Sequence, residues 1–222
     1  MAEWNRADGE EKRYSRIGAL CKVFWVLFRV LAYVAGILVG LLAVMAVVLI
    51  FVRVTPEELL FLPSMKVTEI EGVRHFGVSL GNGVEVFKAC AEVGVSSIKG
   101  TVYAGLFTLM AGLAVSVPVF HFLSCLMKNV SSGKVLSADN AGFVNYIGLA
   151  IMVGNPIVLL IQRFYNYKLI SYFVEEKLEF DFGIDLFGFL LGLLIIVIGT
   201  VYGYACTLHK EELALVVSES RD

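Results

Sequence analysis

The chain has 222 residues, of which 58% are hydrophobic, and its mean hydropathy is +0.80. A water-soluble surface does not tolerate so large an apolar fraction, which excludes an ordinary soluble globular domain. The formal net charge of −2 and the pI near 6.0 offer no basic surface, so the composition indicates no direct binding of nucleic acid.

Four long stretches of the chain contain no Asp, Glu, Lys or Arg. They are residues 30–52, 101–127, 141–162 and 186–208. A helix of about 20 residues crosses a hydrocarbon core of roughly 30 Å, so each stretch is long enough to span a membrane. A β-barrel would need short alternating strands, whereas these runs are continuous. The sequence therefore predicts an all-α membrane protein whose fold is a four-helix transmembrane bundle.

The remaining segments fall on two sides of the predicted membrane. One side holds the amino-terminal segment with its interfacial helix start (residues 1–29), the loop 128–140 and the tail 209–222, and the other side holds the loops 53–100 and 163–185. Six Lys or Arg residues crowd into residues 6–29, whereas the loop 53–100 spreads five over 48 residues. Cytoplasmic flanks are the ones rich in Lys and Arg, so we predict that both termini are cytoplasmic. The first span is too long for a signal-peptide core, which favours a retained anchor.

The loop of residues 53–100 is the extramembrane segment long enough to fold. Residues 55–62 carry the capping and proline signals of a short helix. Residues 66–70 alternate like a strand, and Asn82-Gly83 between alternating segments is a strong hairpin signal. We expect a small β-hairpin followed by a short helix near residues 88–98. An extracytoplasmic cap on the helix ends is favoured over a ligand-binding module.

The two ends of the chain are polar. Residues 1–16 mix charges of both signs, and we expect them to be mobile until the first helix begins. Lys22 and Arg29 are embedded in an apolar, aromatic stretch, which favours an interfacial anchor whose cations reach lipid phosphates, with a lipid-binding site as the alternative. In the tail, residues 212–217 alternate like a strand that would add to a partner, and fraying is the default expectation.

Three pairs of glycines lie one helical turn apart inside the predicted spans. They are Gly36 with Gly40 in the first span, and Gly188 with Gly192 and Gly199 with Gly203 in the fourth. Small residues at this spacing let two helices approach closely in lipid. We predict helix packing at these positions, either within the bundle or against a second copy, so that self-association through glycine faces is one partner hypothesis.

Polar residues inside the predicted spans define a possible intramembrane polar site at His121, Asn155 and Pro156. His121 is either a functional ionisable group or a hydrogen-bonded structural histidine. The break at Asn155-Pro156 either lines a transport site, with Pro118 of the second span as a partial counterpart, or kinks the third helix. We favour the structural interpretation in both cases.

Residues 133–162 carry the most specific motif of the chain. Gly133 ends a loop, Ser137 can cap the next helix, and Asp139 lies in its first turn, where the helix dipole favours an acid. The motif runs through Gly133, Leu136, Ser137, Asp139, Asn140, Phe143, Ile147 and Gly148. Its spacing resembles the pattern "G-x-x-F-S/T-x-E-N-x-x-L-x-x-x-I-G" of an uncharacterised bacterial family of four-span membrane proteins, domain of unknown function twenty-nine seventy-five.

The end of the chain matches the pattern of that family more loosely. Leu208, Glu211 and Val216 fit it, whereas Ala205 and Ala214 replace a glycine and a leucine. The resemblance implies a multi-pass protein of the bacterial inner membrane. Genes of the family often sit beside a small helix-turn-helix regulator, which implies a membrane partner that holds or releases a transcription factor. Candidate contact residues for such a partner are Gly133, Ser137, Asp139 and Asn140, with helix capping as their alternative role.

The sequence indicates no catalytic, metal or cofactor site. The predicted spans contain no Asp or Glu, and the four cysteines show no metal-ligand spacing. We therefore predict a non-enzymatic regulatory or scaffolding protein whose partners are the lipid bilayer and a cytoplasmic regulatory protein. The alternative is a small-solute permease or channel component built around Pro118, His121, Asn155 and Pro156. A structural subunit of a larger membrane complex is a third possibility.

Overall fold

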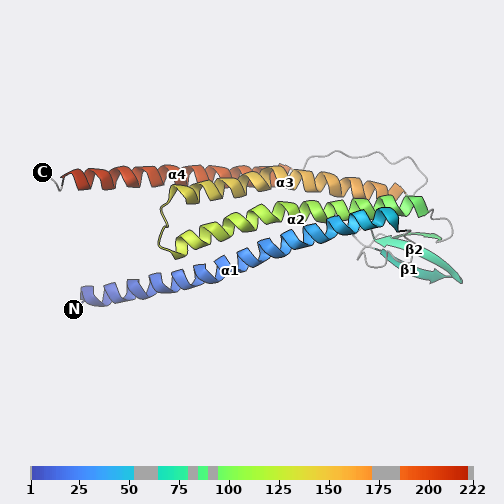
Figure 1. The fold of residues 1–222 in the computed structure, drawn as a ribbon, viewed down its shortest axis with the longest axis horizontal. Coiled ribbons are helices and arrows are strands. Elements are labelled where there is room, and N and C mark those ends of the chain that lie inside the picture. The colour runs from blue at the N-terminus through green and yellow to red at the C-terminus, as the bar shows by residue number, and fades with distance from the viewer. Residues whose placement is uncertain (1, 53–64, 80–84, 90–94, 172–185, 220–222) are drawn as a thin grey trace. The chain divides into compact units, whose positions relative to one another are not determined.

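The structure is a computed structural model that describes residues 2–52, 65–79, 85–89, 95–171 and 186–219. Four long helices and three strands follow one another in the chain. They are α1 (Ala2–Phe51), β1 (Met65–Ile70), β2 (Val73–Ser79), β3 (Glu85–Ala89), α2 (Val95–Ser131), α3 (Ala138–Ser171) and α4 (Leu186–Glu219). Figure 1 shows their course from the amino to the carboxyl end.

Each of the four described helices is long and apolar enough to cross a membrane. The candidate spans are Ile17–Phe51, Val102–Ser131, Ala138–Tyr167 and Leu186–Ser218. Large apolar side chains such as Ile37 and Val201 are both 63% exposed, as expected where lipid surrounds a helix. The prediction of four apolar membrane-spanning helices that pack as a bundle is therefore confirmed, and the protein contacts the lipid bilayer.

The helices extend beyond the predicted spans at both ends of the chain. The expectation that residues 1–16 precede the helix is wrong, because α1 already begins at Ala2. At residues 212–217, where fraying was the default expectation and a strand the alternative, the chain is helical, because α4 continues to Glu219. Ala, Leu, Glu, Lys and Arg dominate these segments and are good helix formers. A helix nucleated by an apolar span adds one hydrogen bond for each further residue, which favours this extension.

The chain forms two compact units. Unit 1 consists of Met1–Ile37, Leu113–Pro156 and Asp185–Asp222, and unit 2 consists of Leu38–Gly112 and Ile157–Ile184. Unit 1 brings together parts of all four helices, and the residues discussed below as sites lie in it, apart from Gly40.

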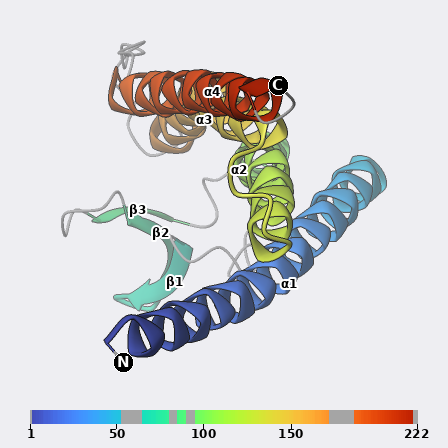
Figure 2. The same cartoon turned by 90° about the vertical axis from the view of Figure 1, so that its left-hand side faces the viewer.

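Unit 2 contains a three-stranded antiparallel sheet with the order β1-β2-β3 (Figure 2). A two-residue turn, Glu71-Gly72, joins β1 to β2, and both residues have positive φ, 53° and 76°. This is the conformation that a tight hairpin with right-handed strand twist requires. β2 and β3 pair through Val78 with Val86 on either side of the predicted Asn82-Gly83 turn, whose residues 80–84 lie outside the described part of the chain.

Two short helices were expected in the loop of residues 53–100. The short helix expected near residues 88–98 is wrong at its start, because Lys88 belongs to β3, where it pairs with Phe76. Residues 95–98 are helical, as the first residues of the long helix α2. The short helix expected at residues 55–62 lies outside the described residues.

Candidate functional site

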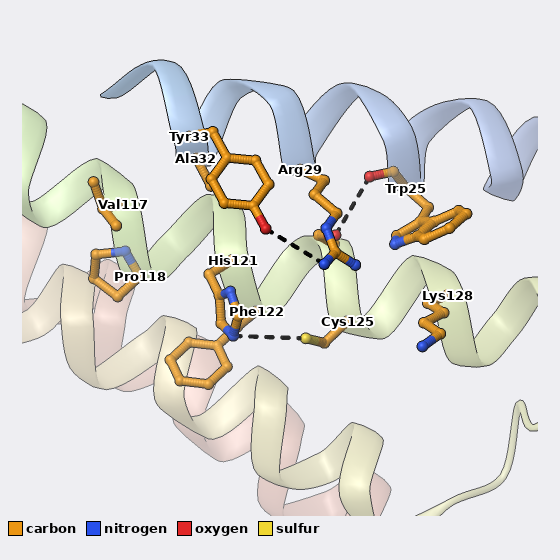
Figure 3. A pocket seen from close by; sticks show the side chains of 11 residues that line it. Trp25, Arg29, Ala32, Tyr33, Val117, Pro118, His121, Phe122, Cys125 and Lys128 are labelled. Atoms are coloured by element: carbon orange, nitrogen blue, oxygen red, sulfur yellow. Dashed lines mark hydrogen bonds between the residues drawn. The ribbon is translucent and has the colours of Figure 1, made fainter. Parts of the chain in front are cut away.

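A cavity of about 500 Å³ lies between α1 and α2 in unit 1 (Figure 3). Helix α1 contributes Trp25, Arg29, Ala32 and Tyr33, and helix α2 contributes Val117, Pro118, His121, Phe122, Ser124, Cys125 and Lys128. The two helices are joined beside it, where buried Ser124 donates a hydrogen bond from Oγ to the Trp25 carbonyl oxygen at 3.3 Å. The rings of Phe28 and Phe120 stack 6.3 Å apart and add an apolar contact between the same helices.

Arg29 lines the cavity from α1 and contacts Tyr33 one helical turn away. Its Nη2 donates to the Tyr33 hydroxyl at 3.4 Å, and its guanidinium carbon lies 5.8 Å from the centre of the Tyr33 ring. Figure 3 shows the guanidinium pointing away from α1 toward α2. Lys128 is exposed and lines the same cavity from α2. The described residues that line the cavity include no Asp or Glu, so the cavity is electropositive.

His121 is exposed and also lines this cavity. Its Nε2 lies 3.8 Å from the Cys125 sulfur one helical turn away, and its ring meets Phe122 edge to face at 5.5 Å between ring centres. Phe122 in turn stacks on Tyr146 of α3 at 5.0 Å. The structure therefore places His121 beside cations and aromatic rings. The other two residues of the predicted polar site, Asn155 and Pro156, do not line this cavity.

Asn155 and the glycines of α4 lie at the interface between α3 and α4. A Cβ atom on Gly188 would overlap the Asn155 amide, one on Gly192 would overlap the backbone of Met152, and one on Gly199 would overlap Asn145. Gly203 lies 3.2 Å, measured from such a Cβ, from Ala141. The two helix backbones thus approach closely along this row of glycines. Asn155 therefore fills space against α4.

The glycine pair of the first span has different surroundings. A Cβ on Gly36 or Gly40 would meet nothing within 4 Å. The predicted close packing at these two glycines therefore has no counterpart among the described residues of one chain. Packing against a second copy stays a prediction.

The loop between α2 and α3 begins with a defined helix end. Gly133 has a φ of 78°, and its N–H donates to the Val130 carbonyl at 3.1 Å, while the Lys134 N–H donates to the Asn129 carbonyl at 3.0 Å. These two bonds are those of a Schellman motif, in which glycine adopts the left-handed conformation that closes a helix. At the other end of the loop, the Asp139 N–H donates to Ser137 Oγ at 3.3 Å, so Ser137 caps α3.

Asn140 ties the middle of this loop to the helices. It is 0% exposed, and its Nδ2 donates to the carbonyls of Lys134 at 2.8 Å and Val135 at 2.9 Å. Its Oδ1 accepts a hydrogen bond from Asn129 Nδ2 at 2.8 Å. The hydroxyl of Tyr202 in α4 donates to the same Val135 carbonyl. A residue buried in this way shapes the loop and is not available to touch a partner, which corrects the expectation for Asn140.

Four residues at this end of unit 1 form an exposed loop surface. They are Lys134, Val135, Leu136 and Asp139, of which Val135 and Leu136 are 49% and 48% exposed. Of these four residues, only Asp139 was predicted as a contact residue, although Leu136 also belongs to the motif. The motif did not reveal Asn129 and Tyr202, which hold the loop from α2 and α4. No local signal marks such partners, because they come from distant parts of the chain.

Among the described residues, no group of three or more His, Cys, Asp or Glu side chains is placed to hold a metal ion. Comparison of the chain with protein-family models, curated proteins and solved structures found no match. The resemblance of residues 133–148 to a known pattern therefore stays a prediction. The fold defines the class: this is an integral membrane protein with four spans.

Proposed function

We propose that this protein is a non-enzymatic regulatory or scaffolding protein of the bacterial inner membrane. In this proposal the exposed loop surface of Lys134, Val135, Leu136 and Asp139 binds a protein on the cytoplasmic side. The resemblance of residues 133–148 to a four-span family points to a small helix-turn-helix regulator as that partner. Both termini lie in the cytoplasm, and the three-stranded sheet of unit 2 lies on the outer side as a cap.

The orientation is supported by the distribution of cations along the chain. Six Lys or Arg residues within residues 6–29 flank the first span, and such flanks are retained in the cytoplasm. The loop between α2 and α3 follows the second span and therefore lies on the same side as the amino terminus. A cytoplasmic protein has access to it there.

The observation that carries the proposal is the order of this loop. The Schellman bonds at Gly133, the three hydrogen bonds of buried Asn140 and the Tyr202 hydroxyl fix its backbone. A loop that is already ordered loses little conformational entropy when it binds, and this favours affinity. Its exposed part joins two apolar side chains, Val135 and Leu136, with charged neighbours, as in the centre and rim of a protein interface.

Site-specific photo-crosslinking in cells tests the proposal directly. A photoreactive amino acid at Val135 is expected to give one discrete cross-linked protein, identified by mass spectrometry. Leu136→Asp and Asp139→Ala are expected to abolish or weaken recovery of that protein after detergent extraction. Leu213→Asp is the matched control, because Leu213 is 53% exposed and lies beyond the uncharged run of the fourth span.

Two outcomes would contradict the proposal. One is a wild-type chain that gives no discrete adduct from Val135. The other is that Leu136→Asp leaves the recovery of the cross-linked partner unchanged, or that Leu213→Asp lowers this recovery as much as Leu136→Asp does. Either result would remove the loop surface from partner binding.

A further inference from the structure

The electropositive cavity between α1 and α2 is lined by two cations, Arg29 and Lys128, and the sequence places both at the same depth in the membrane. Arg29 is the last charged residue before the uncharged run 30–52, and Lys128 is the first after the uncharged run 101–127. Consecutive spans cross a membrane in opposite directions, so these two run ends lie at the same membrane surface. Both side chains line one cavity, which therefore lies at the level of lipid headgroups.

The walls of the cavity change in character along α1 and α2. Trp25, Arg29 and Lys128 lie at or outside the ends of the uncharged runs, whereas Ala32 and Val117 belong to the runs themselves. A ligand in this cavity meets cations at one end and apolar side chains at the other. An inorganic anion would leave the apolar end unused, and an uncharged apolar molecule would leave the cations unpaired.

We propose that this cavity binds an anionic phospholipid. Arg29 and Lys128 bind the phosphate of the lipid, and its acyl chains lie against Ala32 and Val117. The Tyr33 hydroxyl, which accepts from Arg29 Nη2 at 3.4 Å, positions the guanidinium. A guanidinium presents several N–H donors in one plane and matches phosphate oxygens well. Basic pockets between membrane helices are a recognised type of headgroup site.

Native mass spectrometry of the detergent-released protein tests the proposal with phosphatidylglycerol and phosphatidylcholine supplied in equal amounts. The wild-type chain is expected to retain phosphatidylglycerol in preference. One cation near a membrane surface contributes roughly a fivefold preference for anionic lipid, so Arg29→Gln and Lys128→Gln are each expected to lower it about fivefold. Arg29→Lys, which keeps the charge, is expected to lower it less.

Lys22→Gln is the matched control for charge. Lys22 is an exposed cation of the same helix α1, but it does not line the cavity, so its removal is expected to leave the preference unchanged. Arg29 and Lys128 are both exposed, so Arg29→Gln and Lys128→Gln are each expected to retain the fold. Circular dichroism and size-exclusion chromatography check each variant.

Fluorescence locates the bound lipid. The chain has two tryptophans, Trp4 and Trp25, so Trp4→Phe leaves Trp25 of the cavity as the single reporter. Phosphatidylglycerol is expected to shift its emission, and Arg29→Gln or Lys128→Gln to weaken the shift. Inorganic phosphate at the same concentration is expected to have no such effect.

Three results would overturn the proposal. Equal retention of phosphatidylglycerol and phosphatidylcholine would show that the cavity does not select an anion. A loss with Lys22→Gln as large as with Lys128→Gln would show a diffuse attraction to the membrane surface. An emission shift with inorganic phosphate alone that depends on Arg29 would assign the cavity to a soluble phosphate instead of a lipid.

Discussion

Replacing Asn140 by leucine tests the physical basis of the ordered loop. Asn140 is 0% exposed and makes three hydrogen bonds, to Lys134, Val135 and Asn129. Leucine has a similar volume but leaves two carbonyls and one amide without this partner. Each buried polar group that loses its partner costs roughly 1–3 kcal/mol. Lys134 and Val135 are themselves exposed, so water replaces part of the loss, and we expect a total destabilisation of about 2 kcal/mol.

Unfolding by sodium dodecyl sulfate in mixed micelles measures the free energy of unfolding, and limited proteolysis measures opening of residues 132–140. Asn140→Leu is expected to lower the free energy of unfolding and to accelerate proteolytic cleavage within the loop. The neighbouring Asp139→Asn is the matched control, because Asp139 is exposed and asparagine keeps the size of its side chain. A change of less than about 0.5 kcal/mol for Asn140→Leu, with unchanged proteolysis, would refute the account of the loop, since surface substitutions produce changes of that size.

The remaining predictions concern glycines and use the same unfolding measurement. Gly192→Ala is expected to destabilise the protein by about 2 kcal/mol, because its Cβ would overlap the backbone of Met152. Gly36→Ala, in a helix with open space around it, is expected to leave stability unchanged or to raise it by up to about 1 kcal/mol. Equal effects of the two substitutions would contradict the close approach of α3 and α4. Gly133→Ala is expected to cost roughly 1 kcal/mol because its φ is 78°, and Gly142→Ala, which is helical with open space, serves as its control. A neutral Gly133→Ala would show that this helix end does not need the left-handed conformation.

The helical part of the fold was the most predictable from sequence. A run without Asp, Glu, Lys or Arg over about 20 residues has few alternatives to a membrane-spanning helix, and all four such runs lie in helices, apart from Val52 at the end of the first. The ends of the helices were less predictable. Charged residues beside a span mark the limit of the apolar run, but they are good helix formers, so α1 begins before its run and α4 continues past its run.

The small sheet was predictable only in part. Asn82-Gly83 pointed to paired strands, and β2 and β3 do pair on either side of it. The turn at Glu71-Gly72 was missed, because glutamate rarely takes a positive φ and gives no hairpin signal. Lys88 and Ala89 were expected in a helix, whereas pairing with β2 places them in a strand.

The candidate sites depend on contacts that local patterns do not specify. The motif at residues 133–148 predicted Ser137 as a helix cap and Asn140 as a contact residue. The spacing of a motif does not predict that Asn140 is buried, because its hydrogen bond to Asn129 comes from another helix, α2. The sequence placed Arg29 near lipid phosphates. It could not show that Arg29 shares a cavity with Lys128, since this depends on which faces of α1 and α2 meet.

The central claim is that the chain crosses a membrane four times and returns both ends to the cytoplasm. Reporter fusions test this claim most directly. A fluorescent reporter that matures only in the cytoplasm is fused to either terminus, and alkaline phosphatase, which is active only outside the cytoplasm, is inserted at the Glu71-Gly72 turn. We predict fluorescence from both terminal fusions and phosphatase activity from the insertion. Fluorescence from one terminus but not the other, or a phosphatase insertion that is inactive although expressed, would contradict the four-span topology.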